Sequence, residues 1–344
     1  MHKPYGRFKY LIHLLPLALR RVVAGMRPDE YETCRQILAA KYIPGVERPQ
    51  VVGPFSWGDE HPDRKFLVIR RRDLAAGLFS HFQTNLAWMR FAEEHGLTPV
   101  VDMKTAENLY RGKSREVNPW EIFFKQAEGF RLKDIARAKT VYVTGNRQPE
   151  APGLKMASFT VAALMIWRQI AHRHAQLTEE ILDEVQTVER RLFAGKKVLG
   201  VLLRGTDYLA LRPPGHPIQP TIELALERVA TRVREGGFDL VFLVTEDATI
   251  VESFRRAFGD RLRMTDQEPI DYRGKGYIAS RKEVRGDLKR AHDYLVRIAI
   301  LSRCKSVICG RTSGSLGAAI LSEGFEESYF WDLGTYPEKQ TEEK

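Results

Sequence analysis

The feature that most constrains the fold is the alternation of short apolar runs with amphipathic helical segments in the second half of the chain. Apolar runs stand at residues 200–203, 240–244 and 306–309. Segments with helical spacing stand at residues 220–234, 248–258 and 288–304. Strands that alternate with helices form a parallel sheet whose two faces are covered by those helices. The second half therefore predicts a Rossmann-like α/β domain.

The first half shows a looser version of the same alternation. Its apolar runs and helical segments stand at residues 66–69, 82–95, 98–102, 140–144, 158–174 and 178–193. We therefore predict an α/β protein with two Rossmann-type domains that face a central cleft. The expected parts are an N-terminal basic helix with its connecting region at residues 1–64, a first domain at 65–194 and a second domain at 195–344.

The charge balance restricts the partners. The chain carries 54 Lys and Arg against 44 Asp and Glu, a net charge of +10, which favours anionic partners. The excess is spread along the chain and no nucleic-acid-binding motif accompanies it, so we expect no nucleic-acid partner. Cys34, Cys304 and Cys309 are few, odd in number and without metal-ligand spacing. This pattern indicates reduced thiols in the cytoplasm.

Residues 1–27 combine basic flanks with an apolar run that His13 and Pro16 interrupt. The run falls short of the roughly 20 residues that span a bilayer, and it has no small-residue cleavage site of a signal peptide. Basic residues beside leucines and aromatics suit a helix that lies on an anionic membrane surface, here the inner face of the plasma membrane. A helix packed on the first domain is the alternative.

Polar residues follow three apolar runs of the second half, at residues 204–207, 245–247 and 310–315. The carboxyl ends of parallel strands lie at one edge of a sheet, so we expect these loops to converge on one site. Arg204 suits a phosphate there because its planar donor fork matches phosphate oxygens, and Asp207 could orient that fork. A salt bridge that closes the strand end is the alternative.

The loop at residues 310–315 carries Thr312 and Ser313 and leads into a helix. Hydroxyl groups at the start of a helix receive anionic oxygens well. An ordinary capped helix with small residues is the alternative. Asp247 likewise suits either a ligand contact or the N-cap of the helix that follows it.

Residues 200–208 (Gly-Val-Leu-Leu-Arg-Gly-Thr-Asp-Tyr) resemble the Val-His-x-Arg-x-x-Asp signature of the fucosyltransferase superfamily. In that family the arginine, here Arg204, holds the diphosphate of GDP-fucose. Leu202 stands where the family has histidine, and Gly205 stands where many members have a second arginine. The family's Thr-Asp-Asp element resembles residues 245–247, which implies that Asp247 lies at the guanine.

The same resemblance extends to other segments. The family's serine-rich loop implies that Thr312 and Ser313 lie near the diphosphate. A His-Pro-Ile at residues 216–218 implies a cleft position for His216. Residues 75–82 resemble the family's glycine-rich turn through Gly77, which implies a donor contact. Candidate contacts to the acceptor or diphosphate are Ser80, His81 and, at a strand end, Asp102.

The resemblance implies a GT-B-like, inverting glycosyltransferase that moves fucose from GDP-fucose to a glycan or glycolipid acceptor in bacterial surface polysaccharide synthesis. Because no Asp-x-Asp motif appears, we expect no metal and no other cofactor. The family's candidate base aligns with the region of Arg212, so the sequence identifies no general base. Two alternatives stay open: a glycosyltransferase of this fold with another nucleotide sugar, and a catalytically silent protein that binds sugar nucleotides or glycans.

Overall fold

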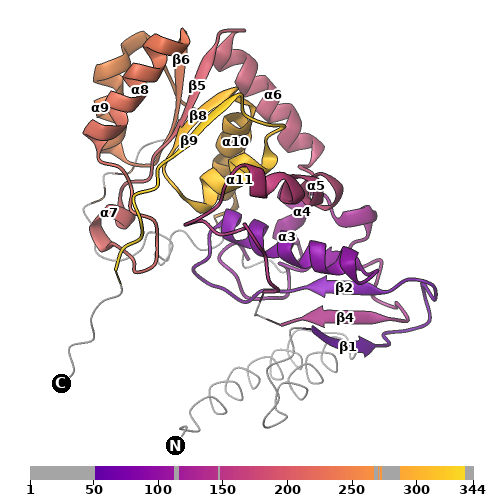
Figure 1. Ribbon diagram of the computed structural model, residues 1–344. Helices are drawn as coiled ribbons and strands as arrows, with labels where there is room; N and C mark the ends of the chain where they lie inside the picture. The colour runs from indigo at the N-terminus through magenta and orange to yellow at the C-terminus, as the bar shows by residue number, and fades with distance from the viewer. Residues whose placement is uncertain are drawn as a thin grey trace, which may run out of the picture.

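The computed structural model describes residues 51–111, 116–145, 148–266, 270, 272 and 287–337. The predicted N-terminal helix at residues 1–27 lies outside these ranges. Two sheets organise the described part of the chain (Figure 1). The first has the strand order β1-β4-β2-β3. Its members are β1 (Val51–Phe55), β2 (Phe66–Ile69), β3 (Thr98–Val101) and β4 (Val141–Thr144). Strands β2, β3 and β4 are parallel, and β1 runs antiparallel to β4.

The second sheet is parallel throughout, in the order β7-β6-β5-β8-β9. Its strands are β5 (Val198–Leu202), β6 (Leu240–Val244), β7 (Leu262–Arg263), β8 (Ser306–Cys309) and β9 (Glu327–Phe330). Every residue of β5, β6 and β8 is buried. The strand order reverses between β5 and β8, and open α/β sheets bind ligands at such a switch point.

Helices cover both faces of the second sheet (Figure 1). On one face, α8 (Ile222–Gly236) and α9 (Ala248–Phe258) bury apolar side chains against β5 and β6. On the other lie α10 (Leu288–Arg303), α11 (Ser313–Leu321) and α6 (Glu179–Phe193). A short helix, α7 (Asp207–Leu211), follows β5. This two-sided cover confirms the mixed α/β class predicted for the second half.

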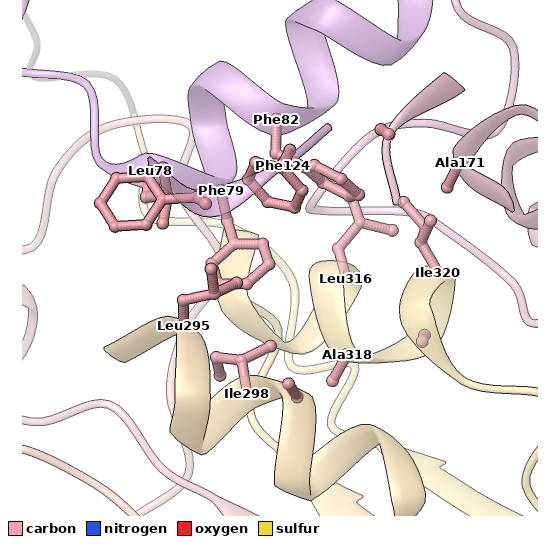
Figure 2. Close-up of a cluster of buried hydrophobic side chains, with 14 of the residues drawn as sticks. Leu78, Phe79, Phe82, Phe124, Ala171, Leu295, Ile298, Leu316, Ala318 and Ile320 are labelled. Carbon is pink, nitrogen blue, oxygen red and sulfur yellow. The ribbon is translucent and has the colours of Figure 1, made fainter. Parts of the chain in front are cut away.

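A continuous apolar core joins the two sheets through α3 (Leu78–Glu94), α10 and α11. Figure 2 shows Phe79 and Phe82 of α3 beside Leu316 of α11 and Leu295 of α10. Helices α4 (Pro119–Phe123) and α5 (Met165–His174) contribute apolar side chains to the same core as α3. The packing places the start of α3 next to the start of α11, so the two halves of the chain meet at a fixed position.

Some predicted elements differ from the observed ones. The predicted helix at 158–174 is shorter, with a 3₁₀ turn at Ala162–Leu164 followed by α5. The predicted connecting region contains β1, an edge strand. Pro54 is tolerated there because proline has no N–H to donate, and an edge strand does not need that hydrogen bond. Helix α6 packs on α10, and the domain boundaries at 65 and 195 stay predictions. None of the described helices is both long and apolar enough to cross a membrane.

Candidate active site

A cavity of about 400 Å³ lies where the loops after β5, β6 and β8 meet the start of α3. Of the residues singled out from the sequence, seven line it: Gly77, Ser80, Arg204, Asp207, His216, Thr312 and Ser313. The predicted convergence of strand ends therefore exists as a physical space. His81, Asp102 and Asp247 make other contacts, described below.

Arg204 leaves the end of β5 and is held by two carboxylates. Its Nη2 lies 3.0 Å from Oδ1 of Asp207, and its Nη1 lies 3.2 Å from Oε1 of Glu246. The guanidinium also lies 4.5 Å from the ring centroid of Tyr208. Burial alone would lower the pKa of Arg204, but the charges of Glu246 and Asp207 more than offset it and raise that pKa. A permanent, oriented cation thus faces the cavity.

Asp247 holds the loop that carries Arg204. Its Oδ1 caps α9 by accepting from the N–H groups of Thr249 and Ile250, and its Oδ2 accepts from Thr206 N at 2.7 Å. A Cβ on Gly205 would lie 2.2 Å from that Oδ2. This contact explains why glycine occupies position 205 in this chain. Of the two adjacent carboxylates at residues 246 and 247, the one that lines the cavity is that of Glu246, which the sequence did not single out.

The start of α11 forms a wall of the cavity. Thr312 is its N-cap, with a reciprocal capping box to Ser315. The N–H groups of Ser313 and Gly314 have no acceptor within the helix, because the first turn of any helix leaves such donors without partners. A Cβ on Gly314 would lie 2.0 Å from the Tyr294 hydroxyl. Glycine there lets α10 approach the donors of α11 closely.

Helix α10 adds three side chains that the sequence interpretation missed. Arg290, Tyr294 and Arg297 line the cavity, and their spacing of four and three residues places them on one helix face. Arg290 pairs with Glu246 at 3.4 Å. Burial raises the pKa of Tyr294 to about 12, so its hydroxyl stays protonated. The i, i+4, i+7 spacing was the signal that could have indicated this face.

The wall from α3 begins at Gly77, the N-cap of that helix. A Cβ on Gly77 would meet its nearest neighbour, the Tyr110 hydroxyl, at 3.9 Å, so the position has room for alanine. Ser80 lines the cavity. Arg71 fixes Ser80 by donating from Nη1 to its carbonyl at 2.9 Å and to its hydroxyl at 3.1 Å.

Asp102 lies at the end of β3, as predicted, and its carboxylate is paired with neighbouring groups. Its Oδ2 pairs with Arg70 at 3.1 Å, and its Oδ1 accepts from the N–H groups of Lys104 and Thr105. The side chain is 3% exposed. Asp102 therefore organises the loop after β3.

His81 is 1% exposed and packs edge-on against Tyr110 behind the cavity wall. Burial, with a smaller contribution from the charge of Arg71, lowers its pKa to about 4. The ring is therefore neutral at neutral pH.

This neutral histidine makes stability depend on pH. Between pH 7 and pH 5 the unfolded chain protonates this histidine near its ordinary pKa of 6.5, whereas folded His81 does not. The stabilisation is complete above pH 6.5 and is lost as the pH falls toward 4. Relative to His81→Gln, the free energy of unfolding of the wild type should fall by about 2 kcal/mol between pH 7 and pH 5. Urea denaturation at both pH values measures it; parallel pH profiles for the two proteins would contradict the assignment.

His216 lines the cavity beside Tyr208, with the ring centroids 5.3 Å apart. Its Nδ1 is buried without a hydrogen-bond partner in the described part of the chain. Burial, and secondarily the charge of Arg204, lower the pKa of His216. The imidazole is therefore a neutral base in the cavity at neutral pH.

No protein-family model matches the chain, and no curated protein sequence matches it. Solved structures do match. POFUT1 in its apo form superposes with a TM-score of 0.50 at 11% identity, covering 78% of this chain and 98% of POFUT1. NodZ alpha-1,6-fucosyltransferase soaked with GDP-fucose superposes with a TM-score of 0.45 at 17% identity, covering 75% of this chain and 93% of NodZ. Fucosyltransferase NodZ from Bradyrhizobium superposes with a TM-score of 0.44 at 17% identity, covering 74% of this chain and 92% of that protein.

These likenesses concern the fold, since all the identities are low. The assignment of the fold rests on the POFUT1 superposition, which spans nearly the whole of that protein. The chain shares the α/β fold of POFUT1.

Proposed function

We propose that the cavity binds a nucleotide sugar and that the protein is a glycosyltransferase. The observation that carries the proposal is the meeting of Arg204 and the start of α11 in one cavity at the switch point of a parallel sheet. An arginine fork and unpaired helical N–H groups together suit a diphosphate. The sequence resemblance and the POFUT1 fold support the same assignment.

The donor that we propose is GDP-fucose. POFUT1 has been crystallised in complex with GDP-fucose, and the motifs at Arg204 and residues 312–313 resemble those of the superfamily that uses this donor. Leu202 is a departure: it is 3% exposed and packs in the apolar core. Another nucleotide sugar is therefore the second candidate, because an apolar residue at this position offers a base no hydrogen bond.

The proposed reaction is a single displacement with inversion. The acceptor oxygen forms a bond to the anomeric carbon while its proton passes to the imidazole of His216. The bond from that carbon to the β-phosphate oxygen breaks, and its electron pair stays on the diphosphate. Arg204 and the N–H groups of Ser313 and Gly314 stabilise the developing charge, which removes the need for a metal. Asp207 orients Arg204.

The acceptor that we propose is a glycan or glycolipid of bacterial surface polysaccharide synthesis, with the enzyme in the cytoplasm at the inner face of the plasma membrane. The basic, partly apolar composition of residues 1–27 supports this location. Sedimentation of the full chain with vesicles of anionic and of neutral lipid tests it; equal recovery with both would contradict it.

His216 gives the reaction a defined pH dependence. A protonated imidazole cannot accept the acceptor's proton, so kcat/KM should fall as the pH falls through the pKa of His216, which lies below the ordinary 6.5. His216→Gln should lower kcat/KM at pH 7 by about a hundredfold or more and should remove this acidic limb. An unchanged limb in the variant would assign the proton transfer to another group.

GDP release from GDP-fucose tests the proposed function. The full chain should release GDP with time in the presence of a mixed glycan acceptor preparation, and EDTA should leave the rate unchanged. A parallel reaction with a UDP-sugar tests the second donor candidate. Binding of nucleotide sugars without turnover of any of them would identify a catalytically silent binding protein.

A further inference from the structure

The three arginines that line the cavity differ in how their charges are balanced. Arg204 and Arg290 both pair with the carboxylate of Glu246. Arg297 forms no ion pair with any carboxylate in the described part of the chain. It is 6% exposed, and its Nε donates a hydrogen bond to the carbonyl of Asp293 at 3.1 Å. A buried cation without a direct ion-pair partner is costly to keep.

The surroundings hold Arg297 in place. Its guanidinium lies 5.5 Å from the ring centroid of Tyr294, and burial lowers its pKa although the charges of Glu246 and Asp293 act in the opposite direction. Tyr294 and Ile298, from the same stretch of α10, approach Gly314 at the start of α11. Arg297 and the first turn of α11 thus border the same cavity and both offer donors to it.

We infer that Arg297, together with the N–H groups of Ser313 and Gly314, forms a second anion-binding subsite that takes oxygens of a diphosphate. The anion supplies the direct ion-pair partner that no described carboxylate gives Arg297, and the arginine fork can donate two hydrogen bonds to it. Arg204 keeps its two carboxylates and contacts the same diphosphate from the β5 side. This inference rests on the proposed function, because it deepens the assignment of that cavity.

Calorimetric titration with inorganic pyrophosphate tests the subsite. Pyrophosphate carries neither base nor sugar, so the result does not depend on which donor the protein uses. Arg297→Gln should weaken pyrophosphate binding roughly ten- to hundredfold. Arg297→Lys keeps the charge without the fork and should weaken it about three- to tenfold. Arg303→Gln is the matched control: it removes one positive charge from α10 at a residue that pairs with Glu189 outside the cavity, and binding should stay within about twofold of wild type.

Equal affinities of wild type, Arg297→Gln and Arg297→Lys would overturn the inference, as would the absence of pyrophosphate binding to the wild type. Since Arg297→Lys retains the positive charge, it supplies the test if Arg297→Gln fails to fold. The proposed function fails separately: Arg297-dependent binding of pyrophosphate without GDP release from GDP-fucose would keep the subsite and reject the transferase assignment.

Discussion

Arg204→Lys is expected to lower kcat/KM for GDP release from GDP-fucose by about a hundred- to thousandfold, the cost of losing a preorganised donor to a developing charge. Lysine preserves a positive charge beside Asp207 and Glu246, so the two carboxylates keep a counter-charge. Lysine lacks the planar fork through which Arg204 contacts both carboxylates and which matches phosphate oxygens. The variant should therefore fold and bind the diphosphate poorly.

Two comparisons make this result specific. Arg303→Lys, on α10 and paired with Glu189, should keep wild-type activity. Arg204→Ala should lower the free energy of unfolding by about 3–5 kcal/mol, because it removes the cation that is paired with the buried carboxylate of Asp207. Steady-state kinetics and urea denaturation give both quantities. Activity of Arg204→Lys within threefold of wild type would contradict the assigned role.

Gly317→Ala is expected to destabilise the protein by about 2–3 kcal/mol, near the upper end for an overpacked core. The new Cβ would lie 2.1 Å from Cδ1 of Phe79, whose ring is 1% exposed and packed against Phe82 and Tyr294. The sign of this stability change is unusual. Replacing glycine with alanine inside a helix ordinarily stabilises a protein by roughly 0.5–1 kcal/mol, whereas here the close contact between α3 and α11 makes the substitution destabilising.

The cause can be isolated with a second substitution. Phe79→Leu opens space opposite Gly317. Gly317→Ala should therefore lower the free energy of unfolding less in that background than in the wild type, and the double-mutant cycle should show coupling between the two positions. Gly77→Ala is the control at a position with room for a Cβ, and its stability should stay within about 1 kcal/mol of wild type. Additive costs of the two core substitutions would indicate that α3 and α11 do not meet at Gly317.

The second sheet is largely predictable because β5, β6 and β8 are apolar at nearly every position and each precedes a helical pattern or follows one. Strands β1 and β9 are harder for physical reasons. In β1, Gly53 and Pro54 have the composition of a loop. In β9, a half-exposed edge strand, the sequence Glu-Ser-Tyr-Phe contains no continuous apolar run.

The site is predictable where parallel strand ends determine it, as at Arg204 and Ser313. Glu246 and Asp247 are adjacent carboxylates, and capping geometry, which the sequence does not reveal, decides that Asp247 turns to α9 and the Arg204 loop. Arg290 and Arg297 lie inside α10, where their spacing also fits the polar face of an ordinary amphipathic helix. Tertiary packing alone makes that face a cavity wall.

The central claim, that this cavity is a nucleotide-sugar site built around Arg204, is tested most directly by calorimetric titration of the full chain with GDP, UDP and ADP. We predict that GDP binds at least tenfold more tightly than UDP or ADP and that Arg204→Lys weakens GDP binding. Failure of all three diphosphates to bind the wild-type protein, or GDP binding that Arg204→Lys leaves unchanged, would contradict it.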